Sequence, residues 1–328
     1  TATVINLKAE VLTYRELPLS GHSPRDIVEG IAFLTDQAEE SLHIDAIGVG
    51  VGGVVTDRGI VRSAPFLMWE DVDLAELLRT RIGIPVFVAN DLTAYTQAQH
   101  WFDLGARHKN FAVLTLGIGT GYGCVANGKK LENQDSGIGL VGHWPLDPLG
   151  PLCTKGHRGC AESMLTTPAI TRSISEALGR EVTWDEVISL AESEDPAISA
   201  VLRASGLALG RLIGAIANLT APEVVIIGGE GVALASLSNR WMRQGLAETR
   251  DPRASVVHVE LASPANETWC RGAAVIGLQG YVSKRQDWIT LIPHDACLHA
   301  SLPALSSLRP LPSYLPALAR SPAALERS

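Results

Sequence analysis

The segment Gly139–Glu162, GLVGHWPLDPLGPLCTKGHRGCAE, carries two thiols and two imidazoles. Its prolines and glycines cannot continue a helix or a central strand, so we expect an ordered loop held by something other than a strand ladder. Cys153, His157 and Cys160 form a C-x3-H-x2-C pattern, and His143 could complete the tetrahedral ligand set of zinc. The alternative is that both cysteines are small buried hydrophobic residues and both histidines are solvated.

This segment resembles the signature of the ROK family, the bacterial sugar kinases and sugar-responsive repressors. The usual form is E-x-G-H followed by C-x-C-G-x-x-G-C-x-E, in which the His and three Cys bind structural zinc and the outer Glu residues and the His face the sugar. Four residues match: His143, Cys153, Cys160 and Glu162. Leu140 stands at the first Glu and Lys155 at the middle Cys. An ammonium group cannot donate a lone pair to zinc, so we expect His157 to replace the missing thiolate.

Composition is that of an ordinary globular protein of 328 residues, with 46% hydrophobic and 19% charged residues. A net charge of -8 gives no broad electrostatic footprint for nucleic acid. Five cysteines, two of them in the candidate metal loop, favour a reducing cytoplasm over a disulfide framework. No apolar run reaches the roughly 18 residues of a membrane span. The chain opens directly on a strand pattern at Thr1, so we expect a segment upstream of it.

The first third of the chain reads as strands and helices in alternation. A hairpin is predicted from residues 3–7 and 11–15, a helix from Pro24, and a buried strand over 47–53. In the family the hairpin would be the second and third strands, and the first strand with its D-x-G-G-T phosphate loop is not in this chain. A helix is expected over 71–81 and a strand over 84–89.

Asn90 and Asp91 follow that strand, where open α/β sheets bind ligands. Asp91 could equally be the N-cap of a helix over 92–101. The pair resembles the ROK N-D motif, whose Asp is the general base on the sugar hydroxyl and whose Asn holds a neighbouring hydroxyl. The resemblance therefore places Asn90, Asp91, His143 and Glu162 around a sugar.

Two glycine turns resemble the family's nucleotide site. The first follows a strand over 111–116 and offers an anion-binding nest, although such turns are common without phosphate. Its candidate phosphate-binding residues are Gly117, Gly119, Thr120 and Gly121, with Ile118 in place of a hydroxyl-bearing Thr. The second ends the segment 222–230, which resembles the adenosine segment N-P-x-x-V-V-I-G-G. There the backbone of Gly228 and Gly229 lies against a purine or simply turns the chain.

The resemblance implies two α/β domains of the actin-like ATPase and hexokinase (ribonuclease H-like) type around a cleft. The small domain would be 1–105 plus a closing helix within 271–283, and the larger domain 106–270 with the zinc-type loop 143–162. Helices are expected over 168–178, 184–193 and 197–219, and a last strand over 256–261. Residues 284–328 lack clear periodicity and are predicted to be a disordered tail.

Function divides between a sugar kinase and the effector domain of a regulator. Leu140, Ile118 and Phe66 replace residues that are polar in the family's kinases, so we interpret the chain as a sugar-sensing effector domain. Three orphaned partners, each costing about 1 to 3 kcal/mol, would cripple a kinase, whereas a sensor needs only differential affinity. The alternative is an ATP- and Mg²⁺-dependent sugar kinase with Asp91 as base; a third possibility is an interaction protein with an empty cleft. The expected partners are a sugar, DNA through an upstream domain, and a second copy or more in a homodimer or homotetramer.

Overall fold

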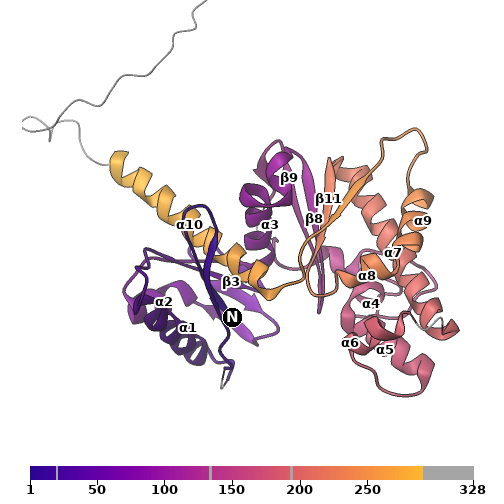
Figure 1. Cartoon of the computed structure of the whole chain (residues 1–328), viewed down its shortest axis with the longest axis horizontal. Coiled ribbons are helices and arrows are strands. Elements are labelled where there is room, and N and C mark those ends of the chain that lie inside the picture. The colour runs from indigo at the N-terminus through magenta and orange to yellow at the C-terminus, as the bar shows by residue number, and fades with distance from the viewer. Residues whose placement is uncertain (20, 133–134, 193–194, 291–328) are drawn as a thin grey trace, which may run out of the picture. The chain divides into compact units, whose positions relative to one another are not determined.

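The computed structural model describes residues 1–19, 21–132, 135–192 and 195–290. Residues Thr1–Arg285 form one compact unit, in which helices pack on sheets as an α/β fold requires (Figure 1). The predicted division of this unit into two domains near residue 105 stays a prediction.

Strands and helices of the first hundred residues follow the expected order, with shifted ends. The hairpin consists of β1 (Ala2–Ile5) and β2 (Val11–Arg15), which pair antiparallel. The helix α1 (Pro24–Glu39) begins where predicted, because Ser23 and Asp26 form a reciprocal capping box. The helix α2 (Leu74–Ile82) begins later than predicted, since Asp73 caps it and Asp71 belongs to β6 (Trp69–Val72).

The parallel pair β3 (Ile47–Val51) and β7 (Val86–Asn90) brings Val51 opposite Asn90 at their carboxyl ends. Between β3 and β7 in the chain, three strands form a small antiparallel sheet: β4 (Val54–Val55), β5 (Val61–Ala64) and β6. One hydrophobic core joins β3 and β7 to α1 and α2, and its buried members include Val28, Val51, Leu74, Leu78, Val86 and Val88.

The central sheet has five strands in the order β10-β9-β8-β11-β12, and β11 runs parallel to both β8 and β12. Its strands are β8 (Phe111–Leu116), β9 (Thr120–Ala126), β10 (Lys129–Lys130), β11 (Val224–Gly228) and β12 (His258–Leu261). Both faces are covered: α3 (Asp91–Phe102) packs on one, and α7 (Pro196–Thr220), α8 (Ala233–Leu237) and α9 (Asn239–Thr249) on the other (Figure 1). Burial on both faces explains why β8 and β11 read as unbroken apolar runs.

The long helix α7 packs closely against α9, and glycines at the contact make the close approach possible. A β-carbon at Gly210 would collide with the Met242 carbonyl, and one at Gly206 would lie 2.7 Å from the Ser238 Cβ. By length and composition α7 is the one described helix that could span a membrane. Because 61% of its most apolar window is buried inside the fold, α7 has the surroundings of a core helix.

The remaining helices lie before, between and after the strands of the chain. They are the 3-10 helices η1 (Leu104–Arg107) and η2 (Leu140–His143), then α4 (Ala161–Leu165), α5 (Thr167–Leu178), α6 (Trp184–Leu190) and α10 (Asn266–Thr290). The closing helix α10 extends beyond the predicted 271–283 at both ends. The predicted tail is therefore wrong for its first residues, which are helical to Thr290, and residues 291–328 lie outside the described part of the chain.

Candidate functional site

A cleft of about 1380 Å³ gathers most of the predicted site residues. It is larger than the roughly 300 to 1000 Å³ of most small-molecule sites. The predicted residues that line it are Asn90, Asp91, Gly117, Gly119, Thr120, Gly121, His143, Cys153 and Glu162. Segments that are far apart in sequence therefore meet in one place, as the resemblance implied.

Asn90, not Asp91, caps helix α3. Its backbone is extended (φ -60°, ψ 141°), and its Oδ1 accepts a hydrogen bond from the Thr93 amide at 3.0 Å. Its Nδ2 donates to the Gly53 carbonyl at 2.9 Å and to Asp91 Oδ1 at 3.1 Å. Asn90 is buried, with 8% of its surface exposed, and it ties the end of β7 to the end of β3.

Asp91 is the first residue of α3 and points at the cleft. Its Oδ1 accepts from the Leu92 amide at 2.7 Å, and a β-carbon placed on Gly52 would lie 3.2 Å from its Oδ2. Burial raises the pKa of Asp91, and the charge of Glu230 adds to that rise, while the hydrogen bonds from Leu92 and Asn90 lower it. A carboxylate with a raised pKa beside a cleft is suited to accept a proton or a hydroxyl hydrogen bond.

The glycine loop after β8 holds a carboxylate. The Ile118 amide donates to Glu230 Oε1 at 3.0 Å, and the Gly117 amide donates to the Gly119 carbonyl at 3.0 Å. The hydroxyl of Thr120 is buried without a hydrogen-bond partner among the described residues. Sequence reasoning missed Glu230, which lies 112 residues beyond Ile118 in the chain.

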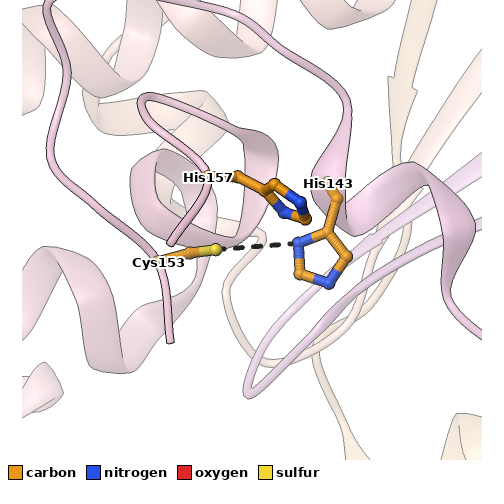
Figure 2. Close-up of side chains that lie close together, drawn as sticks. All are labelled: His143, Cys153 and His157. Carbon is orange, nitrogen blue, oxygen red and sulfur yellow. Dashed lines mark hydrogen bonds between the residues drawn. The ribbon is translucent and has the colours of Figure 1, made fainter. Parts of the chain in front are cut away.

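The loop over residues 143–162, called the metal loop below, brings three candidate metal ligands together. Donor atoms of His143, Cys153 and His157 all lie within 4.8 Å of one another (Figure 2). His143 Nδ1 is 3.8 Å from Cys153 Sγ and 3.9 Å from Cys160 Sγ. Tetrahedral zinc with ordinary bond lengths would place such N and S atoms roughly 3.6 Å apart. These three donors therefore fit zinc with little movement. Cys160 Sγ approaches His143 Nδ1 but lies outside this group of three, and Glu162 Oε2 is nearer to that nitrogen, at 3.4 Å.

The metal loop also has backbone hydrogen bonds of its own, which its proline and glycine content did not predict. Cys153 N donates to the His157 carbonyl at 2.9 Å, and Gly159 N donates to the Pro151 carbonyl at 2.7 Å. Gly156 and Gly159 turn the chain with positive φ angles of 81° and 54°. A fragment of ladder, the bridge between Leu152 and Arg158, thus helps to shape this turn.

Glu162 stands at the start of α4, next to the candidate metal ligands. Its Oε1 accepts from the Thr154 hydroxyl at 2.7 Å, and its Oε2 lies 3.4 Å from His143 Nδ1. Burial lowers the pKa of His143, with Lys155 and His157 acting in the same direction and Glu162 opposing them. The neutral imidazole that results is the form that binds metal.

Gly228 and Gly229 are buried and do not line the cleft. A β-carbon at Gly228 would collide with the Tyr95 hydroxyl, and Gly229 has a φ of 87°. Both glycines therefore turn and pack the chain. Their contact with a purine stays a prediction.

Large apolar side chains line the cleft beside these polar groups. Six of them are more than half exposed: Phe66, Ile118, Leu131, Ile138, Leu140 and Leu152. Trp269 from α10 also reaches the cleft and packs against Tyr95 in a tilted arrangement, with ring centroids 4.7 Å apart. Apolar surface gathered in a concave site is typical of ligand binding.

Comparison with known proteins matches the chain to one family, and its relatives include both sugar kinases and transcriptional regulators. Residues 1–294 match the model of the ROK family. The glucokinase of Thermotoga maritima is 30% identical over 278 residues, which are 79% of this chain and 86% of that enzyme. The DNA-binding transcriptional dual regulator NagC of Escherichia coli is 26% identical over 245 residues, 70% of this chain but only 60% of the regulator.

The fold is that of solved ROK proteins. The crystal structure of a ROK family glucokinase from Streptomyces griseus in complex with glucose and AMPPNP matches with a TM-score of 0.73, over 85% of this chain and 95% of that one, at 23% identity. The predicted actin-like, hexokinase-type fold is therefore confirmed. Because this chain resembles both a kinase and a regulator, the comparisons do not decide between these two functions. The chemistry of the site has to decide.

Proposed function

Because this chain belongs to the ROK family, we propose that it is the sugar-sensing effector domain of a transcriptional regulator. One observation carries the proposal. The cleft keeps the polar groups of Asp91, His143 and Glu162, while Ile118 and Leu140 present exposed apolar side chains where the ROK signature has polar ones. Sugar contacts are thus retained beside a weakened phosphate loop.

The sugar would be held through hydroxyl groups. Asp91 Oδ1 is engaged by Leu92 and Asn90, which points to Oδ2 as the acceptor for the ligand. The Asn90 Nδ2 already donates hydrogen bonds to the Gly53 carbonyl and to Asp91 Oδ1. In this proposal the main role of Asn90 is therefore to position Asp91, and binding the sugar is secondary. His143 and Glu162 add contacts from the metal loop.

Sensing requires that the sugar favour one conformation over another. A ligand that bridges Asp91 and Glu162 makes more contacts when the cleft is closed, so it stabilises the closed form by that difference in affinity. In a regulator this closure is relayed to a DNA-binding domain elsewhere in the protein. A homodimer or homotetramer in the cytoplasm is the expected setting.

Zinc is proposed as a structural ion held by His143, Cys153, His157 and Cys160. Bound there, it would fix the loop that carries Glu162 and orient the His143 ring. Both thiols are buried and His143 is mostly buried, which suits a structural site, whereas His157 lies at its exposed edge. Lys155 is exposed at the mouth of the cleft and takes no part in the ligand set.

A sugar kinase is the second candidate, and the position of Asp91 favours it. A partly buried carboxylate with a raised pKa at the cleft is what a general base on a sugar hydroxyl needs. Sugar-dependent release of ADP, measured with ATP, Mg²⁺ and a panel of hexoses, amino sugars and pentoses, separates the two functions. The effector-domain proposal expects no such release. Turnover of about 1 per second or faster, as in working enzymes, would favour the kinase and refute the proposal.

A further inference from the structure

The carboxylate of Glu230 lies directly against the glycine loop after β8. Its Oε1 accepts the hydrogen bond of the Ile118 amide at 3.0 Å. A β-carbon placed on Gly117 would collide with this carboxylate and would lie 2.6 Å from its Oε2. Both oxygens therefore occupy the space that the absence of a side chain at Gly117 leaves open.

Backbone contacts fix Glu230 in this place. The Gly231 amide donates to the Leu116 carbonyl at 2.7 Å, and a β-carbon on Gly229, whose φ is 87°, would collide with the same carbonyl. The turn that carries Glu230 is thus held on the last residue of β8, the neighbour of β11 in the sheet (Figure 1). The Glu230 side chain therefore reaches the Ile118 amide from a backbone that lies beside β8.

The charges around the cleft also oppose an added anion. Its acidic side chains are Asp91, Glu132, Asp135, Glu162, Glu176 and Glu230. Its basic ones are Lys130, Lys155 and Arg172. One of the three, Lys130, is paired with Glu132 at 3.1 Å. With six carboxyl groups and three cations, the cleft should bind a polyphosphate poorly. The same charges do not oppose the binding of an uncharged ligand.

We infer that Glu230 is a specificity-determining residue: its carboxylate occupies the glycine loop, so the cleft selects uncharged sugars over nucleotides and phosphorylated sugars. The Ile118 amide has one hydrogen to donate, so a phosphate oxygen would have to displace Glu230 and then lie beside the displaced charge. Unpaired like charges of this kind are how a site rejects the wrong ligand. This inference deepens the proposed sugar-sensing function, because it names the class of sugar that the cleft accepts.

The test is a calorimetric titration of inorganic tripolyphosphate, without divalent cations, into wild type, Glu230→Gln and Glu176→Gln. Glu176 lines the same cleft from α5, so its variant removes one charge and leaves the Glu230 carboxylate as the acceptor of the Ile118 amide. Glu230→Gln should bind tripolyphosphate at least tenfold more tightly than wild type, because its neutral amide oxygen is a weaker acceptor for the Ile118 N–H and no longer repels the bound anion. Glu176→Gln should stay within about threefold of wild type, because surface charges are screened by salt.

Three results would overturn the inference. Equal affinity in wild type and Glu230→Gln, including no binding by either, would mean that Glu230 does not guard the loop. Weaker binding in Glu230→Gln would mean that the carboxylate helps to hold phosphate. An equal gain in Glu176→Gln would assign the effect to overall charge. Titration of sugars into the same variants, after thermal unfolding has checked their folding, separates this result from the proposed function: absence of sugar binding refutes the latter alone.

Discussion

Replacing Asn90 by alanine should lower the free energy of unfolding by about 2 to 4 kcal/mol. Loss of the N-cap of α3 contributes about 1 kcal/mol. Loss of the Nδ2 donor leaves the Gly53 carbonyl, bonded at 2.9 Å, without its partner in a buried setting, which costs about 1 to 3 kcal/mol more. Both losses fall on one side chain because Asn90 joins β7, α3 and the end of β3.

Equilibrium urea unfolding measures this change. Asn90→Ser retains a capping oxygen and lacks the amide donor, so it should recover about 1 kcal/mol relative to Asn90→Ala. Asn239→Ala is the matched control, since Asn239 is exposed and its Oδ1 only accepts a bond from Arg243; we expect a change within about 0.5 kcal/mol. An Asn90→Ala protein as stable as wild type, or no better stability in Asn90→Ser, would refute the reasoning.

The pKa of Asp91 is raised by burial, so its ionised form costs stability above the unfolded-chain pKa of about 3.9. Asp91→Asn should therefore raise the unfolding midpoint at pH 7, with the gain fading below about pH 4; an equal gain at both pH values would contradict this. Protein purified without added metal should contain equimolar zinc by elemental analysis, reduced in His157→Ala and unchanged in Cys124→Ser; full occupancy in the His157 variant would place the fourth ligand elsewhere. Gly48→Ala should destabilise the fold by about 1 to 3 kcal/mol or more in urea unfolding, because a β-carbon there collides with the backbone of α10, whereas Gly119→Ala, which meets no atom within 4 Å, should be nearly neutral; similar losses in both would remove packing as the cause.

The sequence could predict those elements whose pattern is local. Strand β8 was predicted with its observed bounds because a strand buried on both faces is a continuous apolar run. The start of α1 followed from Ser23 and Pro24, which are a cap and a first-turn residue. The fold itself rested on the spacing of His143, Cys153 and Cys160 and the other motifs of the family, a pattern in which many positions agree at once.

The features that were not predicted depend on contacts between distant parts of the chain or on backbone conformation, and no local sequence pattern indicates these. Asn90 and Asp91 are adjacent and both can cap a helix, so only the extended backbone at Asn90 decides between them. The end of α10 was missed because residues after 284 lack apolar periodicity, on which helix prediction relies. Glu230 and Ile118 meet only because β8 and β11 pair in the sheet. A Gly-Glu-Gly turn at the end of a predicted strand was the single signal in the sequence for that contact.

The most direct test of the proposed function is a calorimetric titration of glucose, N-acetylglucosamine and xylose into wild type, Asp91→Ala and Glu162→Ala. We predict that at least one sugar binds wild type and that each variant binds it about tenfold or more weakly, as loss of a charge-assisted hydrogen bond of about 1.5 to 3 kcal/mol requires. If no sugar binds, or if both variants bind like wild type, the cleft is not a sugar sensor.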